Sequence, residues 1–141
     1  MTDDDTRLVQ ESWSRIEFVQ EMVAELFYSR LFELDPTLRE VFSAQTRERQ
    51  QKFASFMGAT VRALNRTEVL LPVVRSLGVR NPAFATNDRF HANVALALLW
   101  TLEKSLRREF TPQVKSAWIA TYGVLSQTLR TSVSNDAQRA A

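Results

Sequence analysis

The sequence contains no cysteine, which excludes disulfide bonds, thiolate metal sites and cysteine nucleophiles. Three glycines and four prolines in 141 residues are too few for the turns of a many-stranded sheet. The acidic start, MTDDDTRL, has no apolar core, so we expect no signal peptide. No apolar run approaches the length of a membrane span. The net charge is only +2, and without a concentrated basic stripe we expect no nucleic-acid partner. These absences favour a soluble cytoplasmic protein.

The residues that are present fit one globular domain. Hydrophobic residues make up 45% of the chain and charged residues 24%, which is ordinary for a packed protein. The length suits a single core, and we find no internal repeat or linker. From Ser132 onward the sequence SVSNDAQRAA is polar. We therefore expect one domain over residues 1–133 and a flexible C-terminal tail over residues 134–141.

Apolar residues recur at helical spacing along almost the whole chain. Acidic residues and threonine over residues 3–6 can cap the first helix, Pro36 can open a short one, and Thr111-Pro112 can open the last. Asn81-Pro82 interrupts the pattern, so residues 79–87 are expected to be irregular, and the polar residues 43–48 to connect two helices. The pattern predicts an all-α fold of about seven helices, with apolar faces over Leu8–Ile16, Met22–Phe32, Pro36–Phe42, Phe53–Leu64, Leu70–Leu77, Phe90–Leu102 and Val114–Leu129.

Five stretches carry a family resemblance: LVQESW at 8–13, LFYSRLFELDPTLREVF at 26–42, LPVVRSLGVR at 71–80, HANVALALLWTLE at 91–103 and AWIATYGVL at 117–125. In this order and spacing the chain resembles the single-domain bacterial haemoglobins and the globin half of flavohaemoglobins. The resemblance runs from about Leu8 to Leu129. It implies a globin fold around a haem-type pocket. It also implies haem as cofactor and a diatomic ligand such as O2 or NO, whose binding is controlled by the polarity of the distal pocket.

The resemblance assigns four residues to the distal side of the pocket. Tyr28 matches the distal tyrosine whose hydroxyl donates a hydrogen bond to bound oxygen in this family. Phe42 matches the phenylalanine that packs on the haem face. Phe53 matches an apolar distal residue. Arg49 stands where a glutamine is usual, and there it can gate the pocket or meet a haem propionate. Each has a plainer interpretation: Tyr28 as a half-buried packing residue, the phenylalanines as core, and Arg49 as a solvated surface cation.

The proximal side departs from the family pattern. Asn81 occupies the position of the iron-binding histidine, and an amide is a poor ligand for haem iron compared with imidazole. His91, the only histidine, matches a tyrosine that lies beneath the haem in the family and belongs to a hydrogen-bond network around the proximal histidine. Val133 matches the glutamate that completes that network.

Two functions remain open from the sequence. In the first, the chain binds haem with altered proximal ligation, and His91 is the metal ligand, directly or through water. In the second, the protein is a haem-free globin that acts as a sensory, regulatory or protein-interaction module. His91 is then an interior histidine whose nitrogens are satisfied by neighbours, with Asn81 a candidate.

Enzymatic activity is not favoured by the sequence. It has no Ser-His-Asp pattern, paired catalytic carboxylates or phosphate-binding glycine loop. We also expect no fused reductase domain, so NO dioxygenase activity would need an external reductase. The partners that we expect are a diatomic ligand or small apolar molecule in the pocket, with a second copy of the chain or a regulatory protein left open.

Overall fold

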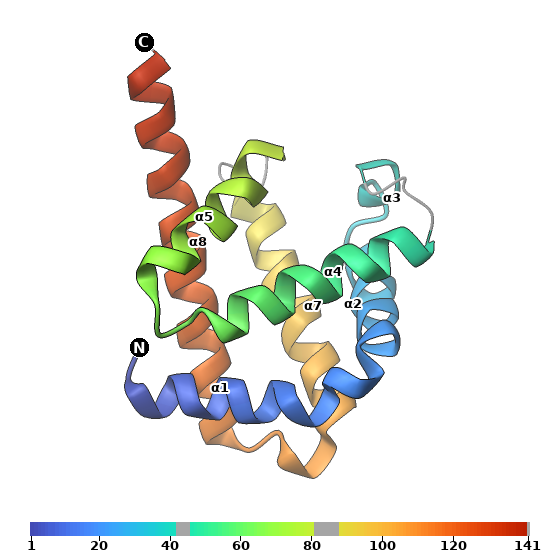
Figure 1. Ribbon diagram of the computed structural model, residues 1–141. Helices are drawn as coiled ribbons and strands as arrows, with labels where there is room; N and C mark the ends of the chain where they lie inside the picture. The colour runs from blue at the N-terminus through green and yellow to red at the C-terminus, as the bar shows by residue number, and fades with distance from the viewer. Residues whose placement is uncertain (42–45, 81–87, 141) are drawn as a thin grey trace.

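The computed structural model describes residues 1–41, 46–80 and 88–140 (Figure 1). These residues contain seven α-helices and two short 3-10 helices, and no strand occurs among them. The all-α fold with about seven helices is therefore confirmed. The elements are α1 (Asp3–Ile16), η1 (Glu17–Val19), α2 (Gln20–Leu34), α3 (Leu38–Val41), α4 (Thr46–Arg62), α5 (Thr67–Arg80), α7 (Asp88–Leu106), η2 (Arg107–Glu109) and α8 (Pro112–Ala140).

Side-chain caps define the starts of two helices. Thr2 caps α1: its hydroxyl accepts from the backbone N–H of Asp5 at 3.1 Å, and the Asp5 carboxylate accepts from the backbone N–H of Thr2 at 3.0 Å. This reciprocal pair is a capping box, and it places the cap one residue before the predicted range of 3–6. At α8 the prediction is confirmed, since the Thr111 hydroxyl accepts from the N–H of Val114 at 3.2 Å and the helix begins at Pro112.

Three helices extend beyond the limits expected from the sequence. α5 continues to Arg80, past Gly78, because glycine lowers the cost of leaving a helix without forcing the helix to end. α4 begins at Thr46, inside the expected connector, and an ion pair between Glu48 and Lys52 at 3.0 Å supports its first turns. α8 is helical in its backbone through Ala140, and the domain limit at residue 133 with a flexible tail stays a prediction.

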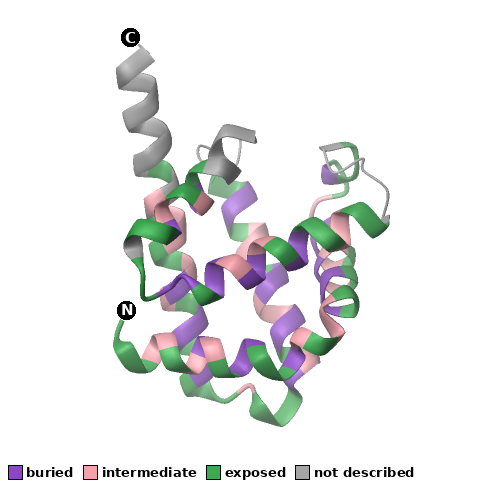
Figure 2. Ribbon diagram, in the orientation of Figure 1, coloured by how far each residue is buried: buried purple, intermediate pink, exposed green. Residues whose placement is uncertain are grey.

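The core lies where the helices cross. α1 runs across α8 at a steep angle and contacts it, while α2 packs on both α7 and α4 (Figure 1). Buried residues line the inner faces of these helices, and exposed residues line the outer faces (Figure 2). This is the arrangement that amphipathic helices adopt around a shared apolar centre. The fully buried side chains at the centre include Val9, Val23, Leu31 and Leu102.

None of the helices in the described ranges is long and apolar enough to cross a lipid bilayer.

Candidate functional site

His91 lies in the interior between α7 and α8, with only 7% of its surface exposed. Its Nδ1 atom is 3.3 Å from the hydroxyl of Tyr122 and 3.4 Å from that of Ser126, both on α8. The Tyr122 hydroxyl also lies 2.9 Å from the main-chain oxygen of His91, to which it donates a hydrogen bond. The other ring nitrogen, Nε2, is buried and has no hydrogen-bond partner in the part of the chain that the structure describes. One side of the imidazole is thus held by α8, and the other side offers an unused nitrogen.

The electrostatic surroundings keep His91 neutral. Burial lowers its pKa below the usual 6.5, and the nearby cation of Arg130 lowers it further, with a partial offset from Asp88. Arg130 and Asp88 form an ion pair at 2.6 Å between α8 and the start of α7. Burial also raises the pKa of Tyr122 to about 12, so its hydroxyl keeps its proton at neutral pH. A neutral imidazole with an unused nitrogen is the form that binds metals.

A second cluster of aromatic rings lies on α2 and α4. Tyr28 is half-buried, and its ring contacts those of Phe27 at 5.2 Å, Phe32 at 6.0 Å and Phe53 at 6.0 Å between centroids. Phe53 is buried and stacks on Phe27 at 4.9 Å. Burial raises the pKa of Tyr28, and Arg49 partly offsets this. The Tyr28 phenol therefore stays protonated and can donate a hydrogen bond.

Arg49 is part of this aromatic cluster rather than a solvated surface cation. Its guanidinium carbon lies 5.7 Å from the Tyr28 ring centroid and 5.3 Å from that of Phe32. Cation–π attraction between arginine and an aromatic face acts over this distance. The side chain is half-buried, and the Nε atom of its guanidinium lies in the interior. The structure thus places Arg49 and Phe53 against the Tyr28 ring, and the distal role of the three residues stays a prediction.

Three of the residues that the family resemblance singled out cannot be placed among these contacts. Phe42 and Asn81 lie outside the described residues, and the side chain of Val133 is likewise outside the described part of the chain. Tyr28 and His91 border the same core cluster, Tyr28 through its ring contact with Phe53 and His91 through its ring contact with Phe90.

Sequence reasoning missed the two partners of His91. Neither Tyr122 nor Ser126 was singled out from the sequence as a neighbour of His91. A signal was present: Trp118, Tyr122 and Ser126 follow one another at intervals of four residues, so they share one face of α8. That spacing shows which residues face inward together, but not which residue of another helix they meet.

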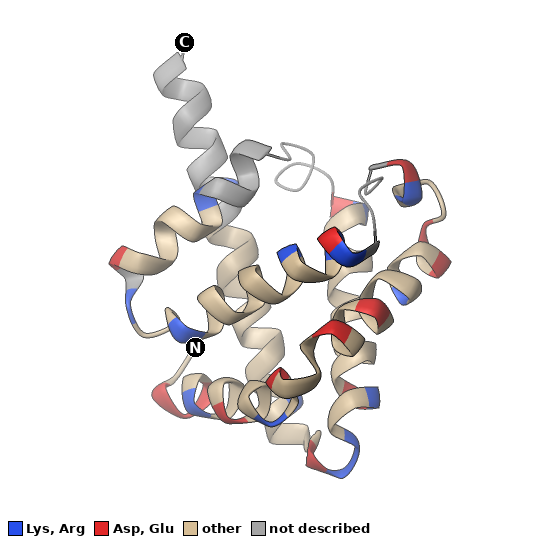
Figure 3. Cartoon of the chain, turned by 45° about the vertical axis from the view of Figure 1, so that its right-hand side comes forward, with Lys and Arg blue, Asp and Glu red and all other residues tan. Residues whose placement is uncertain are grey.

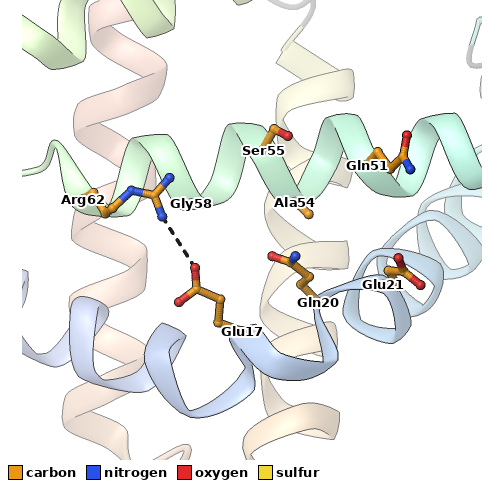
Figure 4. Close-up of a pocket in the computed structure, with 8 residues that line it drawn as sticks. All are labelled: Glu17, Gln20, Glu21, Gln51, Ala54, Ser55, Gly58 and Arg62. Atoms are coloured by element: carbon orange, nitrogen blue, oxygen red, sulfur yellow. Dashed lines mark hydrogen bonds and ion pairs between the residues drawn. The ribbon is translucent and has the colours of Figure 1, made fainter.

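A separate groove of about 310 Å³ lies between α4 and the η1–α2 junction (Figure 4). Its walls are mostly polar, and a 3.5 Å ion pair between Glu17 and Arg62 spans it. None of the predicted site residues lines it; the lining residues are Glu17, Gln20, Glu21, Gln51, Ala54, Ser55, Gly58 and Arg62. A polar groove of this kind lacks the apolar walls typical of cofactor sites.

Charged residues of both signs are interspersed on the surface. α1 carries both acidic and basic residues (Figure 3), and Arg7 pairs with both Asp4 at 3.8 Å and Glu11 at 3.3 Å. Such exposed pairs contribute little to stability. They leave no concentrated positive face on this helix.

The globin family profile matches residues 25–129, which is more than half of the chain. The chain belongs to the globin family. This globin is 26% identical over 139 residues to a neuroglobin of Danio rerio, covering 89% of this chain and 87% of the relative. It is also 29% identical over 112 residues to a flavohemoprotein of Bordetella parapertussis, covering 77% of this chain. That match spans only 28% of the flavohemoprotein, so it concerns one part of a longer protein.

The donor atoms of this globin fit a haem better than a bare metal ion. A bare transition metal needs three or four protein ligands, and no group of three histidine, cysteine or acidic side chains able to hold one occurs among the residues that the structure describes. One buried imidazole nitrogen is enough for iron that a macrocycle already holds, because haem iron needs only axial protein ligands. The unused Nε2 of His91 is such a donor. Haem therefore fits the residues that are present.

Proposed function

We propose that this globin binds haem with His91 in place of the usual proximal histidine and takes up a diatomic ligand such as O2 or NO. The buried Nε2 of His91, without a hydrogen-bond partner in the described part of the chain, carries the proposal. An unpartnered polar atom in an interior lowers stability, so its presence favours a role in which the atom gains a partner. Haem would supply iron as the site where the diatomic ligand binds.

The residues of the chain divide between two tasks. His91 is neutral, so its Nε2 lone pair would hold the haem iron, directly or through water. Tyr28 keeps its proton and can donate a hydrogen bond to the diatomic ligand. Arg49 stands at the edge of the Tyr28–Phe32 ring pair, where it can also meet a negatively charged propionate. Phe42 and Phe53 would pack against the macrocycle, and Asn81 would leave space on the proximal side.

The deciding experiment is a hemin titration of the purified protein, followed by its Soret band. We expect uptake of about one hemin per chain, and a changed or lost Soret spectrum in His91→Ala. Added imidazole should restore the wild-type spectrum of His91→Ala by occupying the space that the side chain left. Rescue separates loss of the ligand from loss of the fold. Wild-type protein that takes up no hemin would contradict haem binding, and an unchanged spectrum in His91→Ala would exclude His91 as the ligand.

A haem-free globin that acts as a sensory, regulatory or protein-interaction module is the second candidate. One observation favours it: the Nδ1 atom of His91 already has two hydroxyl neighbours, Tyr122 and Ser126, as an interior packing histidine would. In this case the wild-type protein takes up no added hemin, and His91→Ala changes only stability.

Two narrower assignments belong to this proposal as well: membership of the bacterial single-domain type and a location in the cytoplasm.

A further inference from the structure

We infer that Tyr122 is a positioning residue that fixes the tautomer of His91, with the proton on Nδ1 and the lone pair on Nε2, and that Ser126 assists it. The inference rests on the proposed function, because the lone pair on Nε2 is the one that would bind the haem iron. It goes beyond that function because it assigns to two residues of α8 the role of fixing the tautomer of His91. Its primary test needs no haem.

The hydroxyl proton of Tyr122 decides the tautomer. A phenol has one proton to donate, and at 2.9 Å from the main-chain oxygen of His91 that proton is already used, since a carbonyl can only accept. The remaining contact of the Tyr122 oxygen, 3.3 Å from Nδ1 of His91, can then be a hydrogen bond only if Nδ1 carries the proton. A neutral imidazole has one N–H, so Nε2 is left with its lone pair.

Ser126 fits the same assignment. Its hydroxyl oxygen lies 3.4 Å from Nδ1, on the same helix face as Tyr122 and one turn further along α8. An N–H that is shared between two acceptors makes two longer bonds instead of one short bond, which agrees with distances of 3.3 and 3.4 Å. Tyr122 has the shorter contact with Nδ1, and its own proton is donated to the main-chain oxygen of His91. We therefore expect Tyr122 to contribute more than Ser126 to fixing the tautomer.

The surroundings of Nε2 agree with a bare lone pair. With Nδ1 as the donor, Nε2 is an acceptor, and no donor reaches it from the described residues. Histidine ligands of metals commonly bind through one nitrogen while a second group holds the N–H of the other, which fixes the tautomer and the ring orientation. Tyr122 and Ser126 hold that N–H here.

The test is the imidazole 15N spectrum of the haem-free protein, recorded at about pH 8, where the ring is neutral. His91 is the only histidine in the chain, so the spectrum contains one pair of ring nitrogens, and protonated and unprotonated nitrogens have well-separated shifts. We expect Nδ1 protonated and Nε2 unprotonated in the wild type. The Nε2–H tautomer, which free histidine prefers in water, would overturn the inference.

Tyr122→Phe removes the hydroxyl and keeps the ring. It should shift His91 toward Nε2–H, and Ser126→Ala should cause a smaller shift in the same direction. The chain has only two tyrosines, so Tyr28→Phe is a matched control that must leave the tautomer unchanged. An unaltered tautomer in Tyr122→Phe, with far-UV circular dichroism like the wild type, would show that the hydroxyl does not fix the ring.

Hemin release gives the second readout. Loss of such a supporting group commonly costs roughly 10–100-fold in metal affinity, so we expect Tyr122→Phe to release hemin to a competing apo-globin at least about ten-fold faster than the wild type. An equal rate, with His91 shown to be the ligand, counts against the positioning role. If wild-type protein takes up no hemin, the proposed function fails, and the 15N spectrum alone decides the inference.

Discussion

Burial shifts the pKa values of His91 and Tyr28 in the candidate site in opposite directions. It disfavours the charged form of each, so it lowers the pKa of His91 and raises the pKa of Tyr28. The lowered pKa keeps His91 neutral at pH 7, with a nitrogen lone pair, and the raised pKa makes the Tyr28 phenol hold its donor proton more firmly than a free phenol does. The sequence shows that a histidine and a tyrosine stand at these positions, but their protonation states follow from the packing around them.

The neutral state of His91 predicts how stability depends on pH in the haem-free protein. Because the pKa of His91 is lower when folded than when unfolded, the unfolded chain binds more protons just below pH 6.5. The stability present above the unfolded pKa is therefore lost as the pH falls through the folded pKa. Arg130 and Tyr122 on α8 and Asp88 on α7 face this ring, and Arg130 acts with burial against protonation.

Urea unfolding at about pH 7.5 and about pH 5.5 measures this dependence. The wild type should lose more unfolding free energy between these pH values than His91→Gln, which cannot titrate there. Carboxyl groups contribute equally to the pH dependence of both proteins, so the difference between the two losses of unfolding free energy measures the contribution of His91. Identical losses would mean that the pKa of His91 is the same in the folded and unfolded chains.

At the scale of elements, one face of α8 joins two other helices. Trp118 on this face donates from Nε1 to the Ser12 hydroxyl on α1 at 2.9 Å, and Tyr122 and Ser126 on the same face meet His91 on α7. Trp118 and Ser12 are both buried. The α1–α8 contact thus helps to set the position of α8, whose Tyr122 and Ser126 contact the His91 ring.

Ser12→Ala should destabilise the protein by about 1–3 kcal/mol, because the Trp118 N–H is left buried without an acceptor. Chemical or thermal unfolding monitored by circular dichroism measures the loss. Ser14→Ala is the matched control: Ser14 is exposed on the same helix and bonds only to the nearby Glu11 carbonyl. We expect it to change stability by no more than about 0.5 kcal/mol. Equal effects of the two substitutions would contradict the role of the Ser12–Trp118 bond.

At the scale of the whole molecule, stability comes from one large core cluster that α1, α2, α4, α7 and α8 share. Leu102 on α7 is fully buried in this cluster, whereas Leu96 on the same helix is 55% exposed. Leu102→Ala should cost about 2–5 kcal/mol through lost apolar contact and the cavity that remains. Leu96→Ala should cost no more than about 0.5 kcal/mol. Urea unfolding of both variants checks this, and similar losses would mean that the core is not organised as described.

Most of the fold could be predicted from the sequence, because helical periodicity is a local property. The apolar spacing around Phe53 and Leu98 gave correct helices and correct inner faces. Helix limits were less certain: Gly78 permits a helix end but does not force it, and Thr2 with Asp5 formed a cap that only the side-chain geometry reveals.

The sequence by itself determined that the chain is all-helical, that it resembles globins, and that an asparagine stands at position 81 with one histidine ten residues later. Tertiary structure decided what surrounds that histidine. Tyr122 and Ser126 reach His91 across 31 and 35 residues of chain, and Arg49 reaches the Tyr28 ring from another helix. Such partners depend on how helices cross, which is set by the packing of the whole core and cannot be derived from the spacing within any one helix.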